Sequence, residues 1–275
     1  MENDDVRAAL REGDLQRARA LAVESVKRAP DDPGARAFLF QLSAIEGDWA
    51  RADKQLDVLA ELKGESLDLV GDYKAAIAAE ATRREVMAGR AAPTVFGEPA
   101  TWVAKMIEAL RLDATGKADA AHALREEAFE EAAPSSGEVD GETFAWMADA
   151  DQRFGPLMEA VINGEYHWIP FEAIKTLDME PPKDLRDVVW AVGVATFANG
   201  GSWPILAHTL YPGSDPKAGG NAGQALGRRT DWSTLSGEHC AGLGQRMFAT
   251  DTNDFPILEI VRLAFDRPTA PSAQG

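Results

Sequence analysis

The feature that most constrains the fold of this chain is a short pattern that recurs after 34 residues. Residues 12–18 read EGDLQRA and residues 46–52 read EGDWARA. This spacing is the period of the tetratricopeptide helical hairpin. In each copy the glycine suits the tight turn between two helices, and the following aspartate can cap the second helix. The pattern therefore predicts stacked helical hairpins at the start of the chain.

Proline positions and apolar periodicity set the expected helix limits. Pro30 falls where such a repeat ends its second helix, and Pro33 suits the first turn of the next one. The expected helices span residues 3–12, 14–29, 33–46, 48–62, 67–89, 100–113 and 118–132, with a loop at residues 91–99. The first half of the chain therefore has no expected strands.

An apolar stripe on the third and fourth expected helices has two interpretations. Phe38 and Leu42 recur at helical spacing on one helix, and Trp49 and Leu56 do so on the next. Such residues either form the core between two helices or line a groove for a partner peptide. Both interpretations stay open, and Phe38, Leu42, Trp49 and Leu56 are the candidate groove.

The second half of the chain has the signature of β-structure. Residues 157–162 and 165–169 are apolar-rich and flank Asn163-Gly164, the strongest short signal for a β-hairpin. Further strands are expected at residues 144–148, 175–180, 187–198, 203–210, 240–249 and 255–264, around Trp232, and short helical turns at residues 171–174 and 220–226. Many short strands and few helices predict a barrel-like or sandwich-like domain.

Together these patterns predict an α+β chain in two domains. A tetratricopeptide-like helical domain would span residues 1–134, and the segment at residues 134–137 is a natural boundary because it reads PSSG. A smaller, mainly-β domain would span residues 138–267. Residues 268–275 would form a flexible tail.

Charge and composition exclude several classes of function. The net charge is −17, and a field of this sign repels phosphate backbones, so no nucleic-acid partner is expected. No run approaches the roughly 20 apolar residues of a membrane span, and the acidic first ten residues do not resemble a signal peptide. Cys240 is the single cysteine and cannot form an internal disulfide. A cytoplasmic location without membrane contact is therefore expected.

The sequence contains no established cofactor or metal motif. The four histidines are His122, His167, His208 and His239, and no two of them have ligand spacing on a helix. His239 and Cys240 are neighbours on an expected strand, where successive side chains point to opposite faces. No metal, no cofactor and no catalytic nucleophile are therefore expected.

The segment ADADQRFGP is the one place where the residues allow acid–base chemistry. Asp149 and Asp151 could act as a catalytic carboxylate pair, which would make the chain a hydrolase-like enzyme using the Asp149–Arg153 loop. The alternative is a structural turn in which Arg153 pairs with a carboxylate.

Several blocks of the chain, in order, resemble one known family. They are ADADQRFGPLMEAVINGEYHWIPFEAI, EPPKDLRDVVWA, LYPGS, RRTDW and GLGQRMFATD, with LDVLAEL, REVMAG and GEPATWVAKMIEAL before them. The chain resembles the ImpE family, also called TagJ or the SciE-type virulence proteins, over about residues 10–265. The family consists of accessory components of bacterial type VI secretion systems.

The resemblance implies a non-enzymatic adaptor or scaffold. Its implied partners are the N-terminal helix of the sheath subunit TssB and the ATPase ClpV. It supplies no catalytic residue, so the polar positions of the family blocks have a structural or a partner-binding role; these are Asp149, Asp151, Arg153, Arg186, Asp187, Arg229, Asp231 and Trp232. A hydrolase-like enzyme and a general peptide-binding module remain the alternatives.

Overall fold

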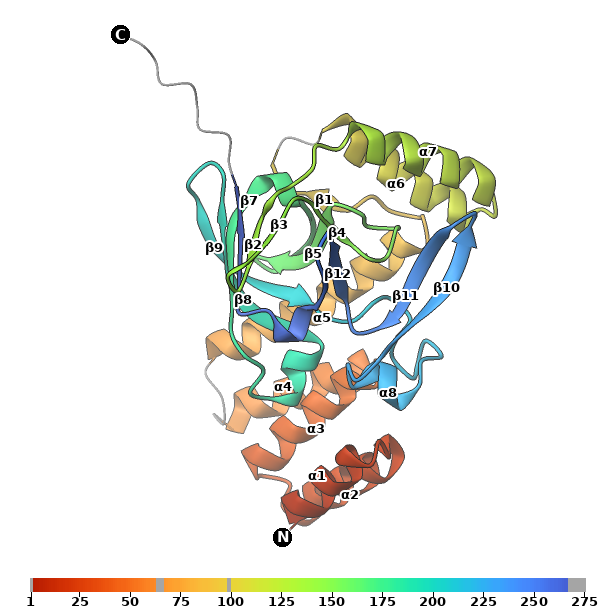
Figure 1. The fold of residues 1–275 in the computed structure, drawn as a ribbon. Helices are drawn as coiled ribbons and strands as arrows, with labels where there is room; N and C mark the ends of the chain where they lie inside the picture. Colours follow the sequence, from red (N-terminus) through yellow and green to blue (C-terminus); the bar gives the residue numbers. More distant parts are fainter. Residues whose placement is uncertain (1, 63–66, 98–99, 267–275) are drawn as a thin grey trace.

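The chain is described here from a computed structural model, which covers residues 2–62, 67–97 and 100–266. Helices dominate its first part and strands its second (Figure 1). The α-helices are α1 (Glu2–Arg11), α2 (Leu15–Arg28), α3 (Pro33–Ile45), α4 (Trp49–Leu62), α5 (Leu67–Met87), α6 (Thr101–Ala114), α7 (Ala118–Glu131) and α8 (Ala222–Ala225). Short 3-10 helices are η1 (Phe171–Ala173), η2 (Leu185–Val188) and η3 (Ile257–Glu259).

The strands form three sheets. They are β1 (Thr94–Val95), β2 (Gly137–Val139), β3 (Glu142–Phe144), β4 (Met147–Asp149), β5 (Leu157–Ile162), β6 (Glu165–Pro170), β7 (Ile174–Met179), β8 (Trp190–Phe197), β9 (Ser202–His208), β10 (Thr230–Ser236), β11 (His239–Gly244), β12 (Met247–Thr250), β13 (Asp254–Pro256) and β14 (Arg262–Phe265). The largest sheet has nine strands in the order β1-β6-β5-β9-β8-β7-β14-β2-β3. A three-stranded sheet has the order β13-β12-β4, and β10 pairs with β11 alone.

The two copies of the repeated pattern form the turns of two helical hairpins, α1–α2 and α3–α4. Gly13 and Gly47 have φ angles of 77° and 73°, the left-handed conformation that glycine adopts without strain. The Asp14 carboxylate accepts a hydrogen bond from the backbone N–H of Arg17 over 2.9 Å and so caps α2. Pro33 begins α3, as the sequence predicts. The four predicted helices are therefore confirmed.

The predicted hairpin at Asn163-Gly164 is also confirmed. Strands β5 and β6 pair antiparallel along their full length, with Ile162 opposite Glu165. Asn163 and Gly164 have φ angles of 50° and 79°, as a type I′ turn requires. Among the described strands no sheet closes on itself, so they do not form the expected barrel.

Several expected strands differ from those observed. Residues 144–148 were expected as one strand, yet β3 ends at Phe144 in the large sheet and β4 begins at Met147 in the three-stranded sheet. The region 187–198 begins with η2 rather than with strand, because the Asp184 and Asp187 side chains cap its backbone reciprocally.

The C-terminal strands and the loop at residues 91–99 differ too. Residues 240–249 divide into β11 and β12, and residues 255–264 divide into the end of β13, η3 and β14. The two residues of β1 lie within the expected loop and pair parallel with β6. The pairing of β1 with β6 and of β12 with β4 joins segments distant in the chain, which local patterns do not contain.

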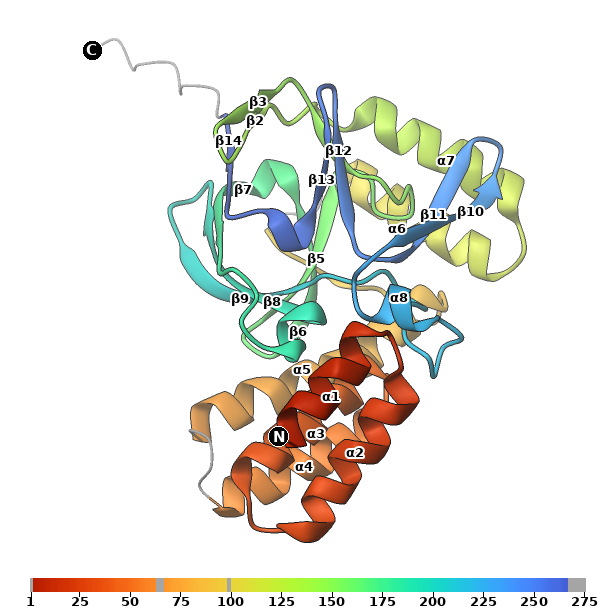
Figure 2. The same cartoon turned by 60° about the horizontal axis from the view of Figure 1, so that its bottom comes forward.

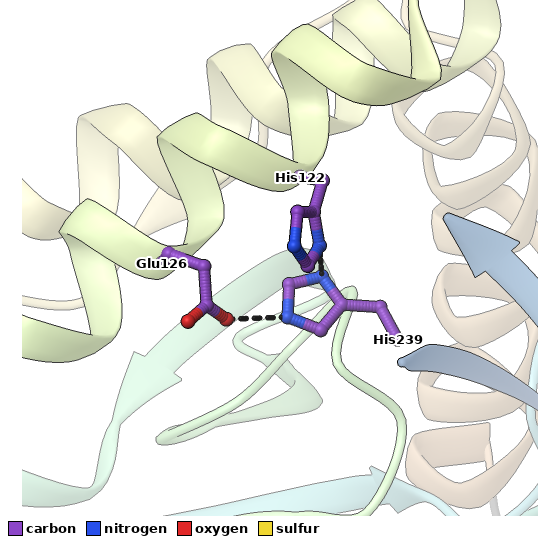
Figure 3. A group of neighbouring side chains, drawn as sticks. All are labelled: His122, Glu126 and His239. Atoms are coloured by element: carbon purple, nitrogen blue, oxygen red, sulfur yellow. Dashed lines mark hydrogen bonds and ion pairs between the residues drawn. The ribbon is translucent and has the colours of Figure 1, made fainter. Parts of the chain in front are cut away.

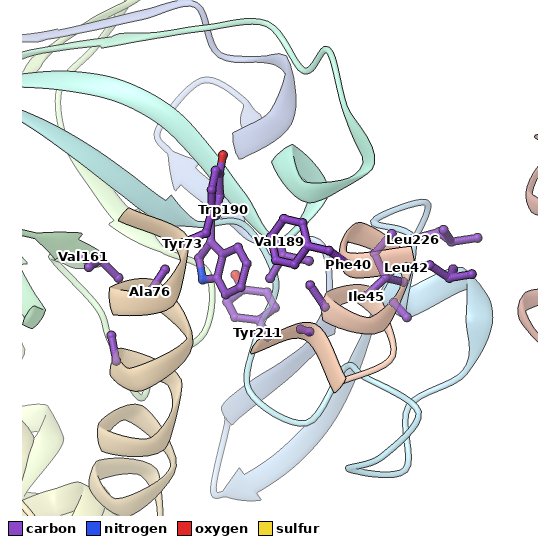
Figure 4. Close-up of a cluster of buried hydrophobic side chains, with 14 of the residues drawn as sticks. Phe40, Leu42, Ile45, Tyr73, Ala76, Val161, Val189, Trp190, Tyr211 and Leu226 are labelled. Atoms are coloured by element: carbon purple, nitrogen blue, oxygen red, sulfur yellow. The ribbon is translucent and has the colours of Figure 1, made fainter. Parts of the chain in front are cut away.

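A shared hydrophobic core joins the helices to the sheet. Phe40 of α3 packs edge-on against Tyr73 of α5, and Tyr73 packs against Trp190 of β8 (Figure 4). Trp190 also contacts Trp49 of α4, with ring centroids 5.6 Å apart. The Trp190 indole N–H donates to a buried carboxylate oxygen of Glu80 on α5 over 3.1 Å. The helical and mainly-β parts therefore meet through a buried, specific contact.

A second hydrophobic cluster lies within the β part. It includes Met158 of β5, Phe171 of η1 and Phe248 of β12, so the three-stranded sheet packs against the large one. Helices α6 and α7 lie on the opposite side from α1–α4, beside the β10–β11 hairpin (Figures 1 and 2). The domain limits 1–134 and 138–267 stay a prediction, and the expected tail 268–275 lies outside the described residues.

Candidate functional site

Asp149, one of the polar residues singled out in the sequence, belongs to a network of buried charged side chains centred on Glu159 and Arg246. Glu159 of β5 is fully buried. Arg83 of α5 donates to its two carboxylate oxygens over 2.8 and 2.7 Å, a bidentate pair. Arg246 and the Tyr166 hydroxyl donate to the same carboxylate. Glu159 therefore joins α5 to the sheet interior through charged hydrogen bonds.

Asp149, at the end of β4, belongs to the same network. It pairs with Arg246 and accepts a hydrogen bond from the Tyr211 hydroxyl over 2.7 Å. The Arg246 Nε donates to the backbone carbonyl of His208 over 3.0 Å. The guanidinium also lies over the rings of Phe154 and Tyr211, 4.6 and 5.0 Å from their centroids. The Arg246 guanidinium is thus surrounded by two carboxylates, a backbone carbonyl and two aromatic rings.

The pKa values of the two carboxyl groups in the network, Asp149 and Glu159, shift in opposite directions. Burial raises the pKa of Asp149 to about 7, although Arg246 opposes the shift. Burial also acts to raise the pKa of Glu159, but Arg83 and Arg246 outweigh it and hold that pKa well below its ordinary value. Glu159 is therefore the permanent anion of the network, and Asp149 titrates near neutral pH.

Asp151 and Arg153 form a second, adjacent pair. The Arg153 Nε lies 2.9 and 3.0 Å from the two carboxylate oxygens of Asp151. The backbone N–H groups of Arg153 and Gly242 donate to the same carboxylate, each over 2.9 Å. Asp151 itself is fully buried. This pair thus fixes the 149–155 loop against β11.

This arrangement favours a structural role for the loop over acid–base chemistry. Asp149 and Asp151 are only 2% and 0% exposed, and both carboxylates are occupied by arginines. A general acid or base must reach the proton it transfers on a substrate. The hydrolase-like alternative therefore gains no support from this geometry.

Arg186 and Asp187 hold a turn near the helical part. Asp187 accepts hydrogen bonds from the backbone N–H groups of Lys183 and Asp184 over 2.7 and 2.8 Å. Arg186 lies over the Tyr73 ring, 4.9 Å from its centroid. These two motif residues therefore position η2 against α5.

The remaining motif residues reach the surface at β10. Arg229 pairs with Asp231, which also accepts from the Gln224 side chain over 2.7 Å. Trp232 is 45% exposed, and its ring lies 5.8 Å from that of Tyr211. Arg229 and Trp232 are exposed, whereas Asp231 is half-buried between Arg229 and Gln224.

The candidate helical groove is largely interior. Leu42 and Leu56 are 0% and 1% exposed, and Phe38 and Trp49 are half-buried. Trp49 instead lines a cavity of about 340 Å³ with Glu80 and Arg83, and the loop after β9 forms another part of its lining. Whether these residues meet a partner stays a prediction.

An open groove does exist on the helical part, with a different lining. It lies across α2, α3 and α4 and has a volume of about 460 Å³. We call it the α2–α4 groove, lined by Val23, Leu39, Asp48, Ala50, Arg51, Lys54 and Gln55. Its floor is apolar and its rim carries both charge signs.

The structure also gathers three residues that sequence spacing alone did not connect. His122 and Glu126 of α7 meet His239 of β11 (Figure 3). The group contains no helical pair of histidines; it consists of a helical His–Glu pair and a histidine 117 positions further along the chain. Burial lowers the pKa of His239, and Arg125 and His122 add to the effect while Glu126 opposes it. The His122–Glu126 spacing was the one available signal.

Within the residues that the structure covers, no helix has the length and apolar character needed to cross a membrane.

The fold and the site define an α+β protein in which stacked helical hairpins adjoin a mainly-β part, with most motif charges paired internally. A profile of the ImpE protein family matches residues 141–264. The type VI secretion system accessory component TagJ of Pseudomonas aeruginosa is 42% identical over 257 residues, covering 94% of this chain and 89% of that protein. This chain belongs to the ImpE/TagJ family.

A solved structure shares the fold over nearly the whole chain. The crystal structure of protein VPA1032 from Vibrio parahaemolyticus matches with a TM-score of 0.85 and 25% identity. The match covers 96% of this chain and 98% of that one. The arrangement of helices before sheets is therefore found in a second protein.

Proposed function

We propose that this chain is an accessory component of a type VI secretion system that acts as an adaptor. The observation that carries the proposal is the 42% identity, over 94% of the chain, to a protein named for that role. The internal pairing of Asp149, Asp151 and Arg153 agrees with a scaffold rather than an enzyme. We further propose that the partner is the N-terminal helix of the sheath subunit TssB.

The helical part offers the surface for such a helix. We interpret α1–α4 as two tetratricopeptide-like repeats, whose exposed surfaces bind helices and extended peptides. The α2–α4 groove combines an apolar floor at Val23 and Leu39 with Arg51 and Lys54 on its rim. An amphipathic helix would bury its apolar face on this floor and place acidic side chains beside the rim.

The mainly-β part would then serve a second contact. Exposed Trp232 and the neighbouring Asp231 belong to β10, which contributes no residue to the lining of the α2–α4 groove. We propose this strand as the surface for a further component, with the ATPase ClpV as the candidate. A net charge of −17 favours a basic surface on that component.

The experiment is a calorimetric titration of a peptide with the TssB N-terminal helix sequence into the full-length chain. Saturable binding with a negative heat-capacity change is expected, because apolar surface is buried. Val23→Glu should abolish binding by placing a charge on the groove floor. The matched control is Val261→Glu, because Val261 is 52% exposed and outside the groove.

Two results would decide against parts of the proposal. Equal loss of affinity in both variants, or none in either, would remove the α2–α4 groove as the binding surface. Absence of binding at about 1 mM peptide, a free energy weaker than about −4 kcal/mol, would exclude TssB helix binding. The adaptor role would then be tested by capturing the assembled sheath on the full-length chain.

A further inference from the structure

Helix α7 presents two metal-ligand side chains on one face toward the β10–β11 hairpin. His122 and Glu126 are four residues apart, so they lie one turn apart on the same side of the helix. His239, the first residue of β11, projects toward both of them (Figure 3). The three side chains come from elements that only the fold brings together.

The distances within this cluster suit a single cation. The two imidazole rings adjoin, with their Nδ1 atoms 3.0 Å apart. The Nε2 of His239, on the other side of the ring, is 2.7 Å from Oε1 of Glu126. One ligand atom from each residue can be chosen so that all three lie within 4.8 Å of one another. Ligands bound at about 2.0–2.2 Å around one tetrahedral ion are separated by somewhat more than 3 Å.

We propose that His122, Glu126 and His239 bind one zinc ion that ties α7 to the β10–β11 hairpin. Two imidazoles and a carboxylate are a ligand set that zinc accepts, with a water molecule in the fourth position. Cobalt and nickel bind nitrogen and oxygen ligands of the same kind, but softer copper(I) prefers sulfur. The site differs from the adaptor surfaces and does not depend on them.

The charge next to the cluster selects which nitrogen of His239 takes part. The guanidinium of buried Arg125 lies 3.3 Å from Nδ1 of His239 and would repel a cation there. Arg125 is itself paired with Asp113, which reduces that repulsion. Nε2 already faces the Glu126 carboxylate, so it is the expected ligand atom. Glu126 is 55% exposed at its side chain and free to adjust its rotamer.

The turn of the hairpin is shaped to admit the His122 ring. Gly237 lies between β10 and β11 with a φ angle of 57°, and a Cβ there would lie 2.9 Å from the His122 ring. A larger residue would therefore push His122 away from His239. The close approach of α7 to this turn thus helps to hold the His122 ring beside His239.

A bound ion would fix the hairpin that carries the exposed motif residues. Asp231 and Trp232 lie on β10, whose partner strand begins at His239. A zinc link from His239 to α7 would reduce the freedom of both strands. The proposed partner surface on β10 would then be ordered before a partner arrives, which lowers the entropy lost on binding.

The test uses the full-length chain stripped of metal with a chelator. Cobalt titration should produce visible d–d absorption of a tetrahedral site that saturates at one equivalent, and zinc should displace it. His122→Gln and Glu126→Gln should each weaken cobalt binding at least about ten-fold, a change of about 1.4 kcal/mol. Zinc should also raise the Tm of the unaltered chain, because a ligand of the folded state stabilises it.

Matched controls separate this site from other ligands of the chain. His167→Gln removes a histidine of β6, and Glu130→Gln removes an exposed carboxylate of α7; both should leave the titration unchanged. Cys240→Ser tests the thiol next to His239, and it too should bind normally. A cobalt signal that survives His122→Gln and Glu126→Gln, or one lost in Cys240→Ser, would overturn the proposal. So would the absence of a saturable signal in the stripped chain.

Discussion

At the scale of single residues, Arg246 is a position where we expect substitution to be poorly tolerated. It is fully buried and pairs with the carboxylates of Asp149 and Glu159. A buried pair gains little over a hydrophobic replacement of the whole network, but removing one partner leaves a charge without compensation. Removing Arg246 alone should therefore destabilise the fold by more than the net contribution of its two ion pairs.

Arg246→Met should destabilise the fold by about 3–5 kcal/mol, because Glu159 would lose one of its two cationic partners. Urea unfolding at neutral pH measures the change. The control is Arg262→Met, which breaks the exposed pair with Asp178 and should cost less than about 1 kcal/mol. Similar costs for both variants would contradict the role given to the buried network.

Asp149 makes stability depend on pH in a stated direction. Its pKa is about 7 in the folded chain against an ordinary 3.8, so the folded state holds a proton that the unfolded state has released. The contribution of Asp149 is therefore fully present below about pH 4 and is lost as the pH rises through 7. The stability of the unaltered chain relative to Asp149→Asn should accordingly fall between about pH 4 and pH 8.

Unfolding free energies at matched pH values for the two proteins measure this difference. Groups that titrate in both proteins, including Glu159, contribute equally to the two stabilities, so their contributions cancel in the difference. The stability of the unaltered chain minus that of Asp149→Asn could instead stay constant or grow with rising pH. Either result would show that Arg246 holds Asp149 ionised throughout.

At the scale of elements, the two repeat glycines differ although their backbones agree. Gly13 and Gly47 have nearly equal φ angles, but their surroundings are unlike. A Cβ at Gly13 would meet nothing within 4 Å, whereas one at Gly47 would lie 2.1 Å from the Asp215 carboxylate. The loop after β9 thus packs against the turn between α3 and α4, but it makes no such contact at Gly13 in the turn between α1 and α2.

Gly13→Ala should therefore cost only the left-handed backbone strain, about 1–2 kcal/mol. Gly47→Ala carries the same strain and must also displace Asp215, so its cost should be larger. Urea unfolding of both variants measures the difference. The double variant Gly47→Ala with Asp215→Gly should return toward the cost of Gly13→Ala. Equal costs for the two single variants would show that the loop does not press on Gly47.

Local patterns were sufficient for elements whose causes are local. Gly13, Asp14 and Pro33 locate helix ends through turn geometry, capping and a fixed φ angle. Asn163-Gly164 identifies its hairpin because few residues adopt the two left-handed conformations of that turn. These signals act within a few residues, so one sequence contains them.

Partners that are distant in the chain account for what the patterns did not indicate. The alternation around Trp146 predicts one strand over residues 144–148, because it does not show that β4 pairs with β12, about 100 residues later. Arg246 was not singled out, since its two carboxylates lie 97 and 87 positions away. The His122–His239 contact is equally remote. Burial of a charge follows from tertiary pairing, and a single sequence does not display it.

At the scale of the whole molecule, the two parts are joined by a core and by charges. Tyr73 and Trp49 of the helical part pack against Trp190 of the sheet. Arg83 of α5 is bound by Glu159 of β5 in the same junction. Separating the parts would expose both the aromatic contact and a buried ion pair. Truncating the chain near residue 134 would therefore leave each piece with an incomplete core.

The chain should unfold as one cooperative unit despite its length. Chains longer than about 150 residues often unfold in separate steps, but the shared junction penalises a state in which only one part is folded. Far-ultraviolet circular dichroism follows mainly the helices, whereas five of the seven tryptophans lie after residue 134, so fluorescence follows the sheet. Both signals should give the same urea midpoint. Arg246→Met in the sheet and Gly13→Ala in the helices should each shift both midpoints together. A helical signal that is lost first, or that moves alone in Gly13→Ala, would show that the junction does not couple the two parts.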